Sequence, residues 1–240
     1  MSIEAKHFAD LQRRAENSGR TVFSDFLGMS SVSELNAMHF YPSPVFWGGF
    51  PDAERVVAAF GSPENEDFPI SVISVRPVNQ KFADELSHRD FLGAVLGLGI
   101  KRDVIGDIII NENCGYLFCL DSIADYITEN LNAVKRTTVK VEKCEELPSV
   151  VVSEPESAEY IVSSRRLDVL TAAVFGLSRK SAAELFSKEK VFVNGCLKGA
   201  SYTVSDGDCV SVRGFGRFAV VQELRRTKKD RAVMEIKVYR

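Results

Sequence analysis

The chain has 240 residues, 45% of them hydrophobic, and a formal net charge of −3 at pH 7. At roughly 100–150 residues per domain, this length allows one large domain or two to three small ones. No apolar run reaches the ~20 residues that span a bilayer, the first residues lack a secretory pattern, and the five cysteines form no CxxC pair, so we expect a cytoplasmic protein with reduced thiols and no metal site.

The charge is divided unevenly along the chain. Residues 1–160 carry 14 Lys+Arg and 25 Asp+Glu, which gives −11, whereas residues 161–240 carry 16 and 8, which gives +8. This asymmetry predicts a basic binding module at the end of an otherwise acidic chain.

Residues 1–67 are expected to form a mostly helical domain, because their apolar residues fall mainly at helical spacings. A loop rich in proline and aromatic residues, 41–50, interrupts them and reads either as a ligand platform or, in preference, as a plug over the core. The expected helices are one that ends at Gly19, one around Phe23, Phe26 and Leu27, one capped by Ser33, and one from Asp52 to Gly61.

Residues 68–146 show a different pattern, in which strands and helices alternate. The run 70–75 alternates and is β-branched, 104–110 and 114–120 are apolar runs joined by a hairpin signal, and 137–141 reads as a last strand. Helices are expected over 87–96 and 121–131. The order β-α-β-β-α-β predicts a ferredoxin-like middle domain, an architecture shared with RNA-recognition folds that hosts many activities.

Two aromatic residues of this middle domain test the RNA-recognition alternative. Tyr116 and Phe118 lie on one face of a predicted central strand, where such modules stack bases. No basic-aromatic signature accompanies them, so burial and a base platform both remain open.

A linker is expected over 147–159, followed by a C-terminal domain over 160–240. A helix should begin near Arg165 and end at Gly176, and Ser178 should cap a second helix that runs to Ser187. Strands are expected at 191–193, 202–204 and 209–212, with a hairpin turn at Asn194-Gly195.

Basic residues cluster around this helix pair. Arg165 and Arg166 precede the first helix, and Arg179 and Lys180 open the second, where free backbone amides and the helix dipole already favour phosphate. Lys188, Lys190 and Lys198 border the hairpin. Asp168 is expected to hold Arg165 in position.

The strings RRLDVL, LSRKSAAELFSKEKVFVNG and VSDGDCVSVRGFGRF together resemble the S-four RNA-binding domain over about sixty residues. The resemblance implies that the helix pair and the hairpin contact structured RNA. The positions that it carries over are Arg165, Arg166, Ser178, Arg179, Lys180, Lys190, Asn194 and Lys198.

The resemblance extends to nearly the whole chain. HRDFLGAVLGLGIKR with the following VIGDI, and FWGGFPDAER nearer the start, are similar to the YlmH family. That family implies a bacterial, cytoplasmic, non-catalytic protein that binds rRNA or tRNA on the large ribosomal subunit in ribosome-associated quality control, and relatives have been linked to cell division and photosystem assembly. As a separate hypothesis, Arg89, Lys101 and Arg102 at the two ends of the middle helix form a second RNA contact.

The sequence lacks the motifs of several enzyme classes. HRD at 88–90 lacks the other kinase motifs, no GxGxxG is present, and His7, His39 and His88 are far apart, so no catalytic, cofactor or small-molecule site is predicted. The alternatives are an RNA-modifying enzyme, for which residues 1–150 look too small and divided, and a cell-division interaction factor. The sequence therefore predicts an α+β chain of three small domains, the last an S-four-type α-α-β RNA-binding domain.

Overall fold

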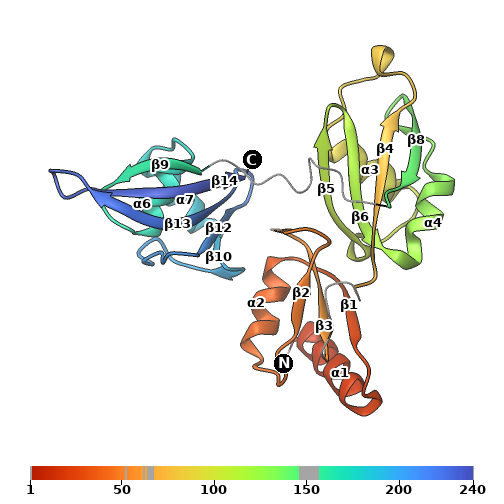
Figure 1. The fold of residues 1–240 in the computed structure, drawn as a ribbon, viewed down its shortest axis with the longest axis horizontal. Helices are drawn as coiled ribbons and strands as arrows, with labels where there is room; N and C mark the ends of the chain where they lie inside the picture. The colour runs from red at the N-terminus through yellow and green to blue at the C-terminus, as the bar shows by residue number, and fades with distance from the viewer. Residues whose placement is uncertain (1, 52, 62, 64–67, 146–156, 240) are drawn as a thin grey trace. The chain divides into compact units, whose positions relative to one another are not determined.

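The computed structural model describes residues 2–51, 53–61, 63, 68–145 and 157–239 (Figure 1). The fold is mixed α+β, and its contacts divide the chain into two compact units, Met1–Ser153 and Glu154–Arg240. The expected linker falls largely on 146–156, outside the described residues, and its last positions belong to a strand. Among the described helices, none is long and apolar enough to cross a membrane.

The first unit opens with two helices and a small antiparallel sheet of order β1-β3-β2. Gly19 ends the first helix in the left-handed conformation (φ 63°), as the sequence predicts. The elements are α1 (Ile3–Ser18), β1 (Val22–Leu27), α2 (Met29–Ala37), β2 (Val45–Trp47) and β3 (Val56–Phe60).

Two helices expected in this region are the strands β1 and β3, so the region combines the helices α1 and α2 with a small sheet. In β1 the register shifts between Phe23 and Phe26, which pair with Ala59 and Val57. The extra residue of this β-bulge turns Phe23 and Phe26 toward the same core, and their spacing thereby imitates a helix. Ser33 lies inside α2 and does not begin it.

The expected helix between Asp52 and Gly61 is strand β3, and Asp52 itself lies outside the described residues. β3 shows no alternation because both of its faces are buried. Val57 and Ala59 face one core, whereas Ala58 and Phe60 face a second core built on α1 and α2. A strand that is covered on both sides reads as a continuous apolar run.

The middle segment folds into a five-stranded antiparallel sheet of order β5-β6-β4-β8-β7 with helices on one face. The β-α-β-β-α-β order of the ferredoxin-like expectation is observed, with one short strand and two 3₁₀ turns added. The elements are β4 (Ile70–Pro77), η2 (Gln80–Phe82), α3 (His88–Gly97), η3 (Arg102–Val104), β5 (Ile105–Asn111), β6 (Cys114–Leu120), α4 (Asp121–Asn130), β7 (Ala133–Val134) and β8 (Thr137–Lys143).

The other face of this sheet packs against the N-terminal sheet. Phe118 is fully buried there, and its ring lies 4.8 Å from that of Phe50, centroid to centroid. Trp47 and Phe50 of the aromatic loop belong to this shared core, so the loop mainly plugs the core, although Tyr41 is 92% exposed. Residues 1–67 and 68–146 thus share one buried core.

The second unit is a six-stranded antiparallel sheet of order β11-β10-β12-β13-β14-β9, with two helices against one face. The run 202–204, expected as a strand, contributes a single bridge between Thr203 and Arg166. The elements are β9 (Ser157–Val162), α6 (Leu167–Val174), α7 (Arg179–Ser187), β10 (Val191–Val193), β11 (Cys196–Leu197), β12 (Cys209–Val212), β13 (Gly216–Arg226) and β14 (Ala232–Tyr239) (Figure 1).

Candidate nucleic-acid interface

The N-terminus of α7 presents two unsatisfied cations. Ser178 caps the helix by accepting a hydrogen bond of 3.1 Å from the Ser181 amide, which fixes the first turn. Arg179 and Lys180 follow the cap and are exposed. Within the described part of the chain, neither side chain has a hydrogen-bond or ion-pair partner. Their charges therefore remain available to a phosphate near the helix dipole.

The hairpin that follows α7 adds further positive charge. Lys190 immediately precedes β10, is half-buried, and has no side-chain acceptor among the described residues. Lys198 lies over the Tyr202 ring, with Nζ 5.3 Å from the centroid. Lys188 differs, because its Nζ is 3.3 Å from a Glu184 carboxylate oxygen.

The two arginines before α6 are held by their own chain. Arg165 donates from Nε to the Val204 carbonyl (2.9 Å) and pairs with Asp206. Arg166 makes a two-pronged pair with Asp168, at 3.0 and 2.8 Å. The expectation that Asp168 holds Arg165 is therefore wrong, because Asp168 holds the neighbouring arginine and Asp206 holds Arg165.

Asn194 organises the hairpin from inside. Its φ is 49°, its Nδ2 donates to Asp208 (2.8 Å), and its Oδ1 accepts from the Cys209 amide (2.9 Å). Asp208 is buried and also accepts from the Ser205 amide (2.8 Å). Sequence reasoning did not identify Asp208 as the acceptor that ties the hairpin together.

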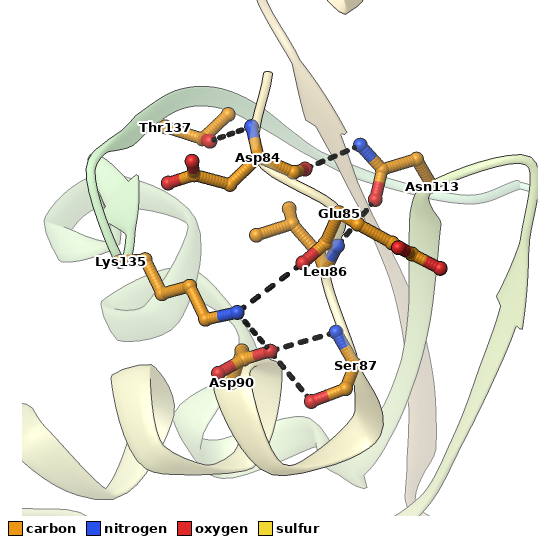
Figure 2. Close-up of polar contacts among 8 residues, drawn as sticks. All are labelled: Asp84, Glu85, Leu86, Ser87, Asp90, Asn113, Lys135 and Thr137. Carbon is orange, nitrogen blue, oxygen red and sulfur yellow. Dashed lines mark hydrogen bonds and ion pairs between the residues drawn. The ribbon is translucent and has the colours of Figure 1, made fainter.

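In the middle segment, Arg89 is exposed in the first turn of α3, and the start of that helix is tightly pinned (Figure 2). Ser87 donates through its amide to Asp90 Oδ2 (2.8 Å) in a capping box, and Lys135 Nζ lies 2.8 Å from the same carboxylate oxygen. These donors stabilise the anion and lower the pKa of Asp90 from 3.8 to about 2, with the Lys135 bond first in size.

The segment that leads into α3 is held by the β5–β6 turn and by strand β8. Asn113, in the β5–β6 turn, donates to the Asp84 carbonyl (2.9 Å) and accepts from the Leu86 amide (2.7 Å). Thr137 in β8 accepts from the Asp84 amide (3.0 Å). Figure 2 shows these contacts converging on residues 84–87, so Arg89 stands on a rigid base.

Arg102 and Lys101 have contrasting surroundings. Lys101 is exposed, and no partner of its side chain occurs in the described residues. Arg102 is half-buried and donates to the carbonyls of Ile105 and Gly106. Burial and the nearby Arg55 guanidinium lower the pKa of Arg102 to about 10. Arg102 therefore braces its own turn, whereas Lys101 stays available to solvent.

Sequence reasoning did not assign a role to Arg55, and the structure shows that it has one. Its Nε donates to the Ile105 carbonyl (2.8 Å), and its Nη2 donates to the carbonyls of Phe26 (2.8 Å) and Arg102 (3.3 Å). It thereby ties β1, η3 and β5 together. The FWGGFPDAER string marks the position but not this structural task.

None of the five cysteines is joined in a disulfide, and burial raises the pKa of Cys119 to about 12. Within the described ranges, no group of three or more His, Cys, Asp or Glu side chains could hold a metal ion.

Comparisons with known proteins bear on both units. Residues 63–147 match the family model described as "Putative RNA-binding domain in YlmH". A Bacillus subtilis (strain 168) protein named "Ribosome-associated protein quality control protein P2" is 34% identical over 195 residues, which cover 78% of this chain and 74% of that protein. A solved structure described as "Cell division protein ylmH from Streptococcus pneumoniae" is 25% identical, with a TM-score of 0.47, and the match covers 60% of this chain and 93% of that one.

Proposed function

The chain belongs to the YlmH family, and from that premise we propose that it is a non-catalytic RNA-binding protein that acts on the ribosome. Its C-terminal unit contacts structured rRNA or tRNA on the large subunit through α7 and the β10–β11 hairpin. The proposed task is quality control of stalled translation in the cytoplasm; the Bacillus subtilis relative is named for ribosome-associated protein quality control.

The observation that carries this proposal is the set of cations at the two ends of α7 that have no partner among the described residues, Arg179 and Lys180 after its N-cap and Lys190 beyond its last turn. Arg179, Lys180 and Lys190 lack acceptors in the described residues, whereas Arg165, Arg166 and Lys188 are paired with carboxylates. Free cations at a helix N-terminus release counterions when they meet phosphate, which drives association. We therefore assign the phosphate contacts to the first three residues.

The remaining predicted residues support the RNA-binding surface and do not themselves contact phosphate in this proposal. Ser178 and Asn194 fix the helix cap and the turn, and Arg165 and Arg166 fix the start of α6, so they shape the surface. Lys198, over Tyr202, stands at the border of the hairpin.

For the middle segment we propose a second RNA contact through Arg89 and Lys101. The family model over residues 63–147 is described as RNA-binding. The sheet face that RNA-recognition folds use for stacking is covered here by the N-terminal sheet. Exposed cations at the ends of α3 then supply the contact. In this proposal residues 1–67 cover one face of the middle sheet. The domain boundaries at 67, 146 and 160 remain predictions.

Sedimentation of cell lysate through sucrose gradients tests the ribosomal part. We expect the protein to comigrate with large subunits, and the variant R179A/K180A/K190A to stay at the top. A matched control, K228A/K229A/R231A, removes the same residue types from the exposed β13–β14 turn and should comigrate normally. Wild-type protein that stays at the top at every salt concentration would favour the alternatives, an RNA-modifying enzyme or a division factor.

A further inference from the structure

A row of cross-strand neighbours runs over the sheet face of the second unit that is turned away from α6 and α7. The helix-side core takes Val191, Val193 and Phe218 from the alternate positions of the same strands. Consecutive pairs in the ladder link the members of the row, which are Leu197, Phe192, Ser211, Arg217 and Tyr239. At ~4.8 Å per strand, the row extends over roughly 19 Å.

Two arginines of this face lie on aromatic rings. The Arg213 guanidinium carbon lies 4.8 Å from the Phe192 centroid, and that of Arg217 lies 4.4 Å from the Tyr239 centroid. A ring holds the planar guanidinium in a fixed orientation and leaves its edge and its outer face uncovered.

Within the described part of the chain, neither Arg213 nor Arg217 has a hydrogen-bond or ion-pair acceptor. Other arginines of the same unit, Arg165, Arg166 and Arg225, are each paired with a carboxylate. Because of this contrast, we infer that the N–H groups of Arg213 and Arg217 are available to donate hydrogen bonds to a bound ligand.

The charge of the face around the two arginines supports an anionic ligand, whereas the row beyond it carries Glu235 and Glu159. The neighbouring cross-strand row consists of Cys209, Ala219, Lys237 and Ser157. These two rows contain Arg217 and Lys237 and no carboxylate, and Arg213 adds a further positive charge beside Phe192. Positive charge interleaved with aromatic rings on a sheet is the chemistry that binds single-stranded nucleic acid, because unpaired bases stack on rings while cations meet phosphates.

We propose that this face, named here the arginine–aromatic face (Leu197, Arg213, Arg217 and Tyr239, together with the buried Phe192 and Ser211), is a second RNA-binding surface of the C-terminal unit and takes single-stranded RNA. Arg213 and Arg217 bind phosphate oxygens through their free N–H groups, and a base stacks beside Tyr239. The inference rests on the proposed function only in that both surfaces bind RNA. The helix-pair site takes structured RNA, and the arginine–aromatic face takes an unpaired segment next to it.

The test measures binding of the full chain to two labelled RNAs by fluorescence anisotropy, an oligouridine of about 12 nucleotides and a stable stem-loop. We expect R213Q/R217Q to raise the Kd for oligouridine about tenfold or more and to lower the salt slope by about 1.4. The Kd for the stem-loop should change by less than about twofold. R179Q/K180Q should show the reverse pattern.

A charge-matched variant, K228Q/R231Q, removes two positive charges from the β13–β14 turn. If it weakens oligouridine binding as much as R213Q/R217Q does, general electrostatics explains the effect and the proposal fails. If R213Q/R217Q binds oligouridine as wild type does while R179Q/K180Q loses the stem-loop, the face serves another partner and the proposed function stands. If wild type binds neither RNA, both proposals fail.

A second pair of variants guards against misfolding of the double substitution. Tyr239→Phe keeps the ring, and Tyr239→Leu removes it. We expect the Phe variant to bind oligouridine like wild type and the Leu variant to bind it severalfold more weakly, with far-UV circular dichroism unchanged in both. Equal affinity of the two variants overturns the stacking contact.

Discussion

The ring of Phe118 in β6 packs against the ring of Phe50, 4.8 Å between centroids, and this contact lies inside the core between the N-terminal and middle sheets. Replacing Phe118 with Ala should therefore destabilise both sheets together, by about 3–5 kcal/mol. Urea unfolding measures this, because Trp47 is the single tryptophan of the chain and belongs to the same core.

Leu185→Ala provides the control for that substitution. Leu185 lies in the core of the second unit, so its loss should leave the Trp47 fluorescence transition in place and shift only the part of the far-UV circular dichroism change that reports the second unit. A Phe118→Ala variant whose Trp47 transition is unmoved would contradict the shared core.

Gly106 offers a second test of the same interface. A Cβ at this position would lie 2.7 Å from a ring atom of Phe26 and 3.0 Å from the Phe118 Cβ. Gly106→Ala should thus destabilise the first unit by about 1–3 kcal/mol. Gly93→Ala should change stability in the opposite direction, because Gly93 lies in α3 and an added Cβ would meet no neighbouring atom within 4 Å. It should stabilise by up to about 1 kcal/mol in the same urea titration.

The Asp90 carboxylate should make stability depend on acid pH. Its folded pKa of about 2 lies below its ordinary 3.8, so its contribution to stability is nearly complete above about pH 5 and is lost as the pH falls toward 2. We expect Asp90→Asn to be less stable than wild type at pH 6 and the difference to shrink between pH 4 and pH 2, followed by urea unfolding. A difference that is constant over this range would show that the carboxylate charge is not what matters.

Asn194 should matter for RNA binding through the shape of the hairpin. Asn194→Ala loses the bonds to Asp208 and Cys209 and puts a side chain unsuited to φ 49° at the turn, at a cost of about 2–4 kcal/mol. Asn194→Gly loses only the bonds and should be less destabilised. Thermal unfolding ranks the two variants, and stem-loop affinity should fall in the same order. An Ala variant of normal stability and poor affinity would instead indicate direct contact with RNA.

The second RNA contact in the middle segment is tested by charge reversal. R89E/K101E should weaken binding to ribosomal RNA, because two exposed cations become anions facing phosphate. K6E/R14E makes the same charge change on the exposed side of α1 and should bind almost normally. Unchanged affinity of R89E/K101E in filter binding would remove this contact from the proposal.

Much of the fold could be predicted wherever local spacing reports the surroundings of a residue directly. The helix that ends at Gly19, the β-α-β-β-α-β order and the Ser178 cap were all confirmed. The strands β1 and β3 were missed because a bulge in one and two-sided burial in the other erase the period of two. Both causes are tertiary, so no window of the sequence contains them.

The candidate site could likewise be predicted only in part. Residue type and helix position predicted where Arg179 and Lys180 lie, but not which cations the protein already uses for itself. Arg165 is bound by Asp206, forty-one residues later in the chain, and Arg102 by carbonyls of its own turn. The arginine–aromatic face was missed because cross-strand register, which gathers its members from five strands, is not visible in sequence order.

The pairing of β9 with β14 has a consequence for how the second unit forms. Val162 pairs with Ala232, about seventy residues later, and β9 has β14 as its sole ladder neighbour in the described sheet. During synthesis β9 leaves the ribosome before β14 does, so its backbone hydrogen-bonding groups remain unpaired until β14 has been synthesised. Such long-range closure makes folding slow and late, so a protein proposed to attend stalled ribosomes would itself be vulnerable when its own synthesis stalls before β14.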